Sequence, residues 1–328
     1  MNVHALMSKP CELHARVLLG NKLLFCSLAN SLKIISLRQT RIDSLLDFIP
    51  QLKHVPIKAS QKEAFGFSSI VGFENDEQYI HSIDGWILLS LTFQKKNIKK
   101  SLLNRRFNDL KIITNENNFK MGKAKLTQEE EEELRAKVYL ELLTEVQPDE
   151  DYLNVIVDTY SKNIYLSNDK AKYQKVFTNL MRKGIESFSM SNFNPHGVGL
   201  HLTQWLYKPT ENLPSEISLE DSTYLTSEQS ARARLTKQDL HSDEIQVLIN
   251  HGKKCSSLGI SFLERLSLTL HESCKLSKVK FSDQLMAEVR EVEEPSSRFD
   301  EMLPFWEVMC SEFTSFYEWL DRVIEQPV

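Results

Sequence analysis

Apolar residues recur at helical spacing most clearly near the end of the chain. From residue 302 onward they follow one another mainly at intervals of three and four: Met302, Phe305, Trp306, Met309, Phe313, Phe316, Tyr317, Leu320 and Ile324. These intervals place them on one wide face of an α-helix. The pattern predicts a long C-terminal helix whose apolar face lies in the core or in a subunit interface, rather than around a cofactor.

Other helices are predicted from their end signals as well as from spacing. Thr127, with Glu130 three residues later, forms a capping-box pattern at the start of one helix. The apolar stripe of that helix comprises Leu134, Val138, Leu142 and Leu143. Further helices are expected over residues 40–52, 169–183 and 242–251, and the last two meet glycines at their ends.

Strand signals lie between these helices. Apolar stretches within residues 23–37, 65–73 and 85–93 predict strands, the last of them buried on both faces. Residues 152–158 and 163–166 predict one hairpin, and residues 265–270 with 279–281 predict another. Residues 210–230 are polar and are expected to form a linker.

The length allows more than one structural unit. A chain of 328 residues corresponds to two domains at about 150 residues each, or to one elongated molecule with two or three lobes. We expect an N-terminal extension over 1–22, a lobe over 23–93, a helical segment over 94–150 and a second lobe over 151–328. The lobes could be built from segments that are not adjacent in sequence.

Charge is unevenly distributed although the formal net charge is only −5. Residues 94–125 contain ten basic residues against Asp109 and Glu116, which gives a local charge of +8, and an acidic run follows at 129–133. The basic residues could contact phosphates, or they could lie on a solvated helix and pair with the acidic run. A second basic set contains Arg232, Arg234, Lys237, Lys253 and Lys254. Two such sets favour an extended phosphate-binding surface without base recognition.

No motif for catalysis or cofactor binding stands out. The sequence has no phosphate-binding glycine loop, no G-x-S-x-G and no H-E-x-x-H, and no cofactor is expected. His196, His201, His251 and His271 match no zinc pattern and are interpreted as surface or half-buried residues. The five cysteines are scattered without a C-x-x-C pair, which fits a reducing cytosol. Neither a secretory signal nor a membrane span is evident, so we expect an intracellular protein.

Several stretches resemble the RdgC family of recombination-associated proteins. The likeness is clearest in Arg-Leu-Thr-Lys-Gln-Asp-Leu, which starts at Arg234, and in Ser-Asp-Glu-Ile, which starts at Ser242. It continues through residues 276–283 and 298–300, and more weakly through 85–93, 152–158 and 202–205. The ordered matches cover most of the chain from about Leu23 onward.

The resemblance implies an α+β protein that forms a ring-shaped homodimer around duplex DNA. Members of the family bind DNA with little sequence preference and limit RecA-mediated strand exchange, and they are not known as enzymes. We therefore expect a non-enzymatic, nucleoid-associated protein of the cytoplasm. The candidate DNA-binding residues from the basic segments are Arg105, Arg106, Lys111, Lys120, Lys123, Lys125 and Arg234. Lys237 and Gln238 match a lysine–glutamine pair that the family uses.

The sequence departs from the family at Thr144–Pro148 and leaves other functions open. The family has a proline-arginine-aromatic loop here, whose aromatic residue helps to close the ring, but this loop has no aromatic residue.

An alternative function is a protein-interaction module that docks a recombination partner through the acidic, aromatic C-terminal region. A metal-dependent nuclease is a third hypothesis, although no spacing singles out a pair of carboxylates.

Overall fold

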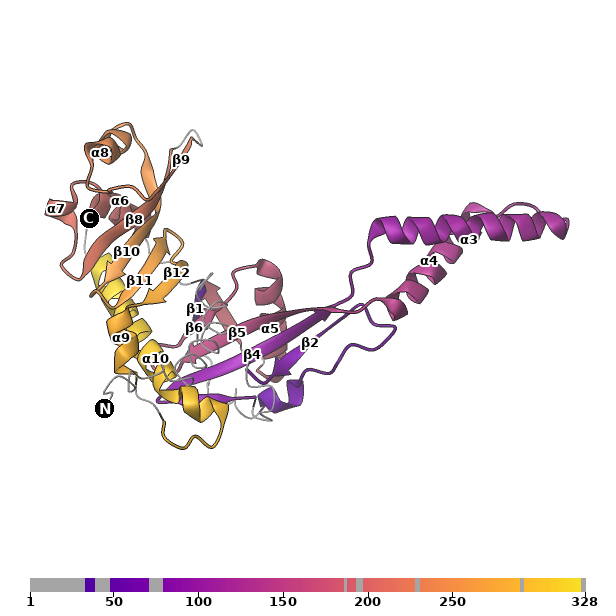
Figure 1. Cartoon of the computed structure of the whole chain (residues 1–328), viewed down its shortest axis with the longest axis horizontal. Helices are drawn as coiled ribbons and strands as arrows, with labels where there is room; N and C mark the ends of the chain where they lie inside the picture. The colour runs from indigo at the N-terminus through magenta and orange to yellow at the C-terminus, as the bar shows by residue number, and fades with distance from the viewer. Residues whose placement is uncertain are drawn as a thin grey trace, which may run out of the picture. The chain divides into compact units, whose positions relative to one another are not determined.

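The computed structural model describes residues 33–38, 48–70, 79–185, 188–192, 197–227, 231–289 and 292–325. Within these ranges the chain is an α+β protein with antiparallel sheets (Figure 1). The expected N-terminal extension lies outside the described residues, as does most of the helix expected over 40–52. At the end of the expected range, residues Ile49–Leu52 form the short 3₁₀ helix η1.

The chain divides into two compact units. Unit 1 comprises residues 1–50, 69–90 and 153–328, and unit 2 comprises residues 51–68 and 91–152. Strands β4 (Trp86–Lys95) and β5 (Asp149–Asp158) each begin in one unit and continue into the other. Unit 1 is therefore assembled from segments that are far apart in sequence.

Seven strands of the described residues form the first sheet. Their order is β2-β4-β5-β6-β1-β7, and β3 pairs with β4 off this path. The members not yet given are β1 (Lys33–Arg38), β2 (Glu63–Ser68), β3 (His81–Ile83), β6 (Asn163–Leu166) and β7 (Ser189–Asn192). β5 and β6 form the hairpin that the sequence predicts, with Val157 opposite Ile164. The start of β4 is fully buried, as its continuous apolar run predicts.

A second, five-stranded antiparallel sheet lies in unit 1. Its order is β12-β11-β10-β8-β9, formed by β8 (Ile217–Thr226), β9 (Arg232–Thr236), β10 (Lys254–Phe262), β11 (Leu266–His271) and β12 (Leu276–Phe281). The predicted hairpin of β11 and β12 is confirmed. The expected linker over 210–230 is wrong, because β8 occupies most of it. The hydrophobic pattern gives no prediction for β10, the central strand.

The long C-terminal helix α10 (Arg298–Ile324) forms much of the core of unit 1. All nine apolar residues of its predicted stripe are buried. The ring of Tyr317 lies 5.2 Å from that of Tyr165 on β6, and the ring of Phe316 lies 5.4 Å from that of Phe262 on β10, measured between centroids. The helix thus packs against strands of both sheets.

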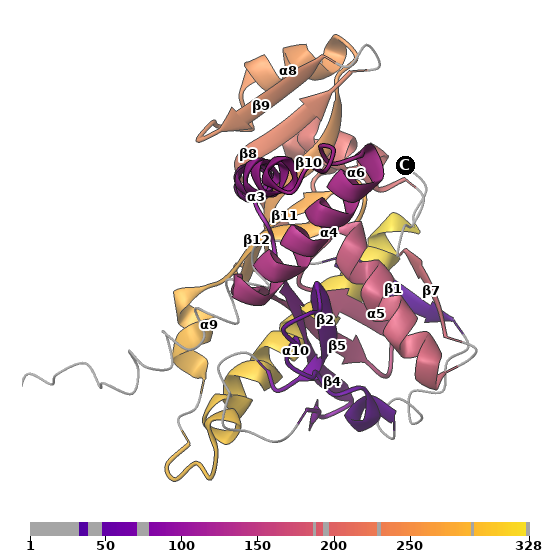
Figure 2. The ribbon, with the colours of Figure 1, turned by 90° about the vertical axis from the view of Figure 1, so that its right-hand side faces the viewer.

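Shorter helices complete unit 1. They are α5 (Ala171–Gly184), α6 (Val198–Leu206), α7 (Pro209–Asn212), α8 (Asp243–Asn250) and α9 (Asp283–Glu288). Both views place α8 beside β9 (Figures 1 and 2). Within the described ranges, none of the helices combines the length and the apolar character that crossing a membrane requires.

Candidate nucleic-acid interface

The basic segment of unit 2 forms most of a helical hairpin. Helices α3 (Lys100–Lys120) and α4 (Gln128–Glu145) lie side by side (Figure 1). The predicted capping box starts α4: the Glu130 amide donates to Thr127 Oγ1 at 3.3 Å, and the Thr127 amide donates to Glu130 Oε2 at 2.8 Å. The Leu126 amide donates to Asn115 Oδ1 at 2.9 Å, which ties the connection between the helices to α3.

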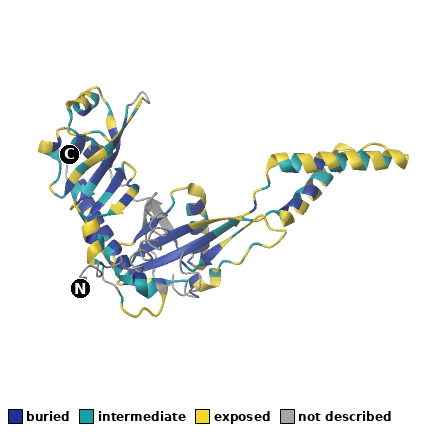
Figure 3. Cartoon of the chain, viewed as in Figure 1, coloured by how far each residue is buried: buried dark blue, intermediate teal, exposed yellow. Residues whose placement is uncertain are grey.

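Polar contacts hold much of the hairpin together. Arg135 on α4 donates to Asn104 Oδ1 at 2.6 Å, and its guanidinium lies 5.4 Å from the ring centre of Phe107. The buried side chains of the two helices are Phe107, Val138, Leu142 and Leu143. Most of the remaining hairpin surface is exposed or half-buried (Figure 3). The hairpin therefore presents its charges to solvent.

The candidate cations of the hairpin differ in what they contact. Lys111 Nζ lies 2.6 Å from Glu131 Oε1, so for this lysine the pairing interpretation is correct. The other five are exposed, and none of them meets a carboxylate in the part of the chain that the structure describes: Arg105, Arg106, Lys120, Lys123 and Lys125. Lys96, which also contributes to the local charge of the segment, is buried. Five unpaired cations thus remain available to an anionic partner.

Large apolar side chains are exposed where the hairpin turns. Phe119 is 83% exposed and Met121 is 70% exposed, next to Gly122, whose φ of +69° suits the turn. The loop at Thr144–Pro148, where the sequence departs from the family, lies at the other end of α4, which leads into β5. The tip of the hairpin therefore carries an exposed aromatic residue. The loop that lacks the family's aromatic residue lies at the opposite end of α4.

The second candidate set lies in unit 1, at the end of β9. Lys237 has a left-handed backbone with φ +55°, and its exposed ammonium has no acceptor among the described residues. The Gln238 amide donates to the Asp221 carbonyl at 3.1 Å, and its side chain donates to Glu244 Oε2 at 3.1 Å. Gln238 thus ties the turn between β9 and α8 to β8 on one side and to α8 on the other, and this turn presents Lys237 to solvent.

Arg234 belongs to a polar face of the five-stranded sheet, called here the open face. Strand pairing aligns Arg234, Tyr224, Ser257 and His271 across four strands, and it aligns Arg232, Thr226 and Lys254 in a second row. The alternate residues Leu258, Leu268, Leu270 and Leu276 belong to the core that contains α10. Lys278 and Lys280 on β12 are also exposed. These two lysines are not among the candidate residues predicted from sequence, because only strand register relates them to Arg234.

Groups suited to covalent or metal chemistry are buried or dispersed. Burial raises the pKa of Cys255 and of Cys274 to about 12, so neither thiol is ionised near neutral pH. His201 was expected at the surface or half-buried, but it is buried, and burial lowers its pKa. Among the described residues, no three side chains of His, Cys, Asp or Glu lie close enough together to hold a metal ion.

Comparison with known proteins gives the family of the chain. A family model described as "RdgC: Putative exonuclease, RdgC" matches residues 30–326. The chain belongs to the RdgC family. The Recombination-associated protein RdgC of Pasteurella multocida strain Pm70 is 27% identical over 266 residues, which cover 79% of this chain and 84% of the relative. The protein of the same name from Shewanella putrefaciens strain CN-32 is 23% identical over 249 residues, covering 75% and 80% of the two chains.

The names attached to the RdgC family point in two directions. The description of the family model names an exonuclease, whereas the relatives are named recombination-associated proteins. Membership of the RdgC family therefore associates the chain with recombination. The resemblance that the sequence shows to this family is confirmed over nearly the whole chain.

Proposed function

We propose that this member of the RdgC family binds DNA through its phosphate backbone, without sequence preference and without cleaving it. The observation that carries the proposal is the set of five exposed, unpaired cations on the α3–α4 hairpin. Such cations displace condensed counterions from DNA, and this term is independent of base sequence. Arg234 and Lys237 add exposed positive charge in unit 1. The net charge of −5 is compatible with this function because the basic residues are locally concentrated.

We further propose that two copies enclose duplex DNA as a ring and thereby limit RecA-mediated strand exchange. Exposed Phe119 and Met121 support a contact between copies, because large apolar side chains at a protruding turn are stabilised by burial against a partner. Lys120 and Lys123 lie beside them in sequence, so such a contact would bring positive charge together around the DNA. Enclosure would slow dissociation, and bound DNA would be less accessible to a recombinase.

The alternative of partner docking through the aromatic C-terminal helix has less support. The apolar face of α10 is occupied by the core of unit 1, so its aromatic side chains are not exposed to a partner. The acidic residues on the outer side of the helix remain accessible, but they offer no apolar anchor for a stable interface.

A DNA-binding isotherm tests the proposal. Affinity for two unrelated duplexes is measured over a series of salt concentrations, and molecular mass is determined on the same sample. We expect equal affinity for both duplexes, a steep fall of affinity with salt and the mass of a dimer. Sequence-selective, salt-insensitive binding would overturn the DNA-binding mechanism. The same mixtures, incubated with Mg²⁺, show whether the duplex is shortened, and shortening by the protein would support an exonuclease instead.

A further inference from the structure

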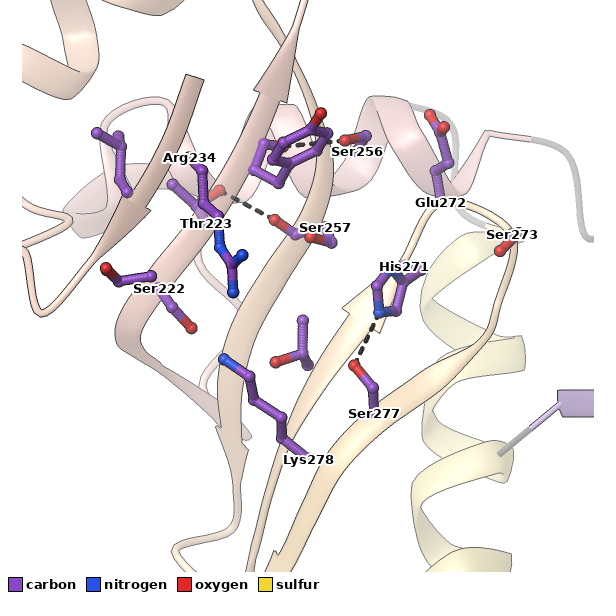
Figure 4. A pocket seen from close by; sticks show the side chains of 14 residues that line it. Ser222, Thr223, Arg234, Ser256, Ser257, His271, Glu272, Ser273, Ser277 and Lys278 are labelled. Carbon is purple, nitrogen blue, oxygen red and sulfur yellow. Dashed lines mark hydrogen bonds between the residues drawn. The ribbon is translucent and has the colours of Figure 1, made fainter. Parts of the chain in front are cut away.

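The open face of the five-stranded sheet contains a hollow of about 450 Å³. Residues from all five strands line it, and most of them carry hydroxyl groups or positive charge (Figure 4). A volume of several hundred cubic ångströms is typical of small-ligand sites. The size and the polar lining together indicate a site for a small polar group rather than for an apolar ligand.

Small residues at the centre of the sheet form the floor of the hollow. Ser257 is 8% exposed and Thr269 is 9% exposed, and neither hydroxyl has a hydrogen-bond partner among the described residues. Both hydroxyl groups face the hollow without a protein partner in the described ranges, so both are free to hydrogen-bond to a polar ligand bound there.

Two cations approach the hollow from opposite edges of the sheet. Arg234 on β9 and Lys278 on β12 point toward one another, whereas the carboxylate of Glu272 points away (Figure 4). Neither cation has an acidic partner in the described part of the chain. Two facing positive charges repel each other, and an anion between them would remove that repulsion.

The histidine in the lining does not add to this positive charge. His271 has its pKa lowered to about 4, by burial first and then by the nearby Lys275 and Lys278, against the opposing effect of Asp169. Its Nε2 atom lies 2.8 Å from Ser277 Oγ, within hydrogen-bond distance. At neutral pH the histidine is uncharged, so Arg234 and Lys278 supply the positive charge inside the hollow.

We propose that this hollow binds one phosphate group of a DNA strand. Arg234 offers a planar fork of donors that matches phosphate oxygens, Lys278 offers a compact charge, and the hydroxyls of Ser257 and Thr269 donate from the floor. The choice of a nucleic-acid phosphate rests on the proposed function and deepens it. The proposed function relies on the overall positive charge of a surface. The hollow would add specific contacts to one phosphate group.

The test compares two pairs of substitutions that remove the same charge from the same two strands. Arg234→Gln with Lys278→Gln empties the hollow of its cations. Arg232→Gln with Lys280→Gln removes exposed cations of β9 and β12 that do not line the hollow. Duplex affinity is measured for both over a series of salt concentrations, and thermal unfolding verifies that both remain folded. Inorganic phosphate and a thymidine dinucleotide, which carries one phosphodiester, are titrated separately into each protein.

The hollow pair is expected to weaken duplex binding about tenfold or more and to reduce the salt slope by about 1, whereas the matched pair costs less than about threefold. Equal losses in the two pairs would overturn the inference, because general surface charge would then explain both. If the native protein binds no duplex, the proposed function fails, and the small probes decide about the hollow. If inorganic phosphate binds the native protein saturably and the Arg234→Gln, Lys278→Gln variant no longer binds it, the hollow is a site for free phosphate. If phosphate binding does not saturate, the proposed phosphate site is overturned.

Discussion

The ammonium group of Lys96 donates a hydrogen bond to the carbonyl oxygen of Leu143 at a distance of 2.8 Å. Leu143 lies in the last turn of α4, where backbone carbonyls lack partners within the helix. The same ammonium donates to the Ala59 carbonyl at 2.9 Å, and Lys96 is only 5% exposed. This lysine therefore satisfies backbone groups within unit 2, although it belongs to the basic segment by sequence.

We predict that Lys96→Met destabilises the protein without a specific effect on DNA. Methionine fills similar space but leaves the carbonyls of Ala59 and Leu143 without their donor, and the expected loss in free energy of unfolding is about 2–4 kcal/mol. Denaturant unfolding measures it. Lys95→Met is the matched control, because Lys95 is exposed and its replacement is expected to change stability by less than about 0.5 kcal/mol. Equal stability of the two variants would contradict a structural role for Lys96.

Charge reversal on the hairpin tests the proposed DNA surface. Lys123→Glu combined with Lys125→Glu is expected to weaken duplex binding at least about tenfold and to reduce the salt slope by about 2, because two phosphate contacts are lost. All sequences are expected to be affected alike. The control is Lys175→Glu with Lys183→Glu, which makes the same charge change at exposed positions of α5. If both variants lose the same affinity, the effect belongs to net charge and not to the hairpin.

The exposed aromatic residue at the tip of the hairpin tests the proposed dimer contact. At protein concentrations where both proteins are monomeric, Phe119→Ser is expected to leave the free energy of unfolding unchanged within about 0.5 kcal/mol, because Phe119 is 83% exposed in the single chain. It is expected to raise the dissociation constant of the dimer about tenfold, since the apolar contact with a second copy is lost. Sedimentation over a range of protein concentrations measures this constant. Ile113→Ser, at a 52% exposed position of the same helix, serves as control, and equal dimerisation by all three proteins would remove the tip from the interface.

The elements that were predictable from sequence are those with one strongly apolar face. α10 is an example, because its stripe from Met302 to Ile324 is buried along its whole length. The capping box of Thr127 and Glu130 is another, since both of its hydrogen bonds depend on residues only three positions apart. Local patterns of this kind need no knowledge of tertiary structure.

Two of the elements that escaped prediction, β8 and β10, are strands with polar residues on the open face. β8 was expected to be a linker because Glu220, Asp221 and Ser222 interrupt its apolar residues. β10 carries Ser256 and Ser257 beside Leu258, and the serines are buried all the same. The serines and threonines that obscure the strand pattern also form the hollow, so the candidate phosphate site could not be found without the register of the sheet. Counting charges likewise cannot separate buried Lys96 or paired Lys111 from the free cations.

His271 leads to a prediction about stability and pH. Its pKa is about 4 in the folded protein, because burial and the neighbouring Lys275 and Lys278 disfavour the charged imidazole more than Asp169 favours it. In the unfolded chain the pKa returns to about 6.5. Between these values the unfolded state binds a proton that the folded state does not. The contribution of His271 to stability is therefore complete above about pH 6.5 and decreases as the pH falls toward 4.

Replacing this histidine removes that part of the pH dependence. His271→Gln keeps a polar side chain near Ser277 but cannot take up a proton, so its free energy of unfolding is expected to fall less between pH 7 and pH 4.5 than that of the native protein. The difference is expected to be about 1–2 kcal/mol, after allowance for partial solvent access. Denaturant unfolding at several pH values measures it, with His241→Gln as a control at an exposed histidine. Parallel pH profiles for the native protein and His271→Gln would contradict a lowered pKa of His271 in the folded protein.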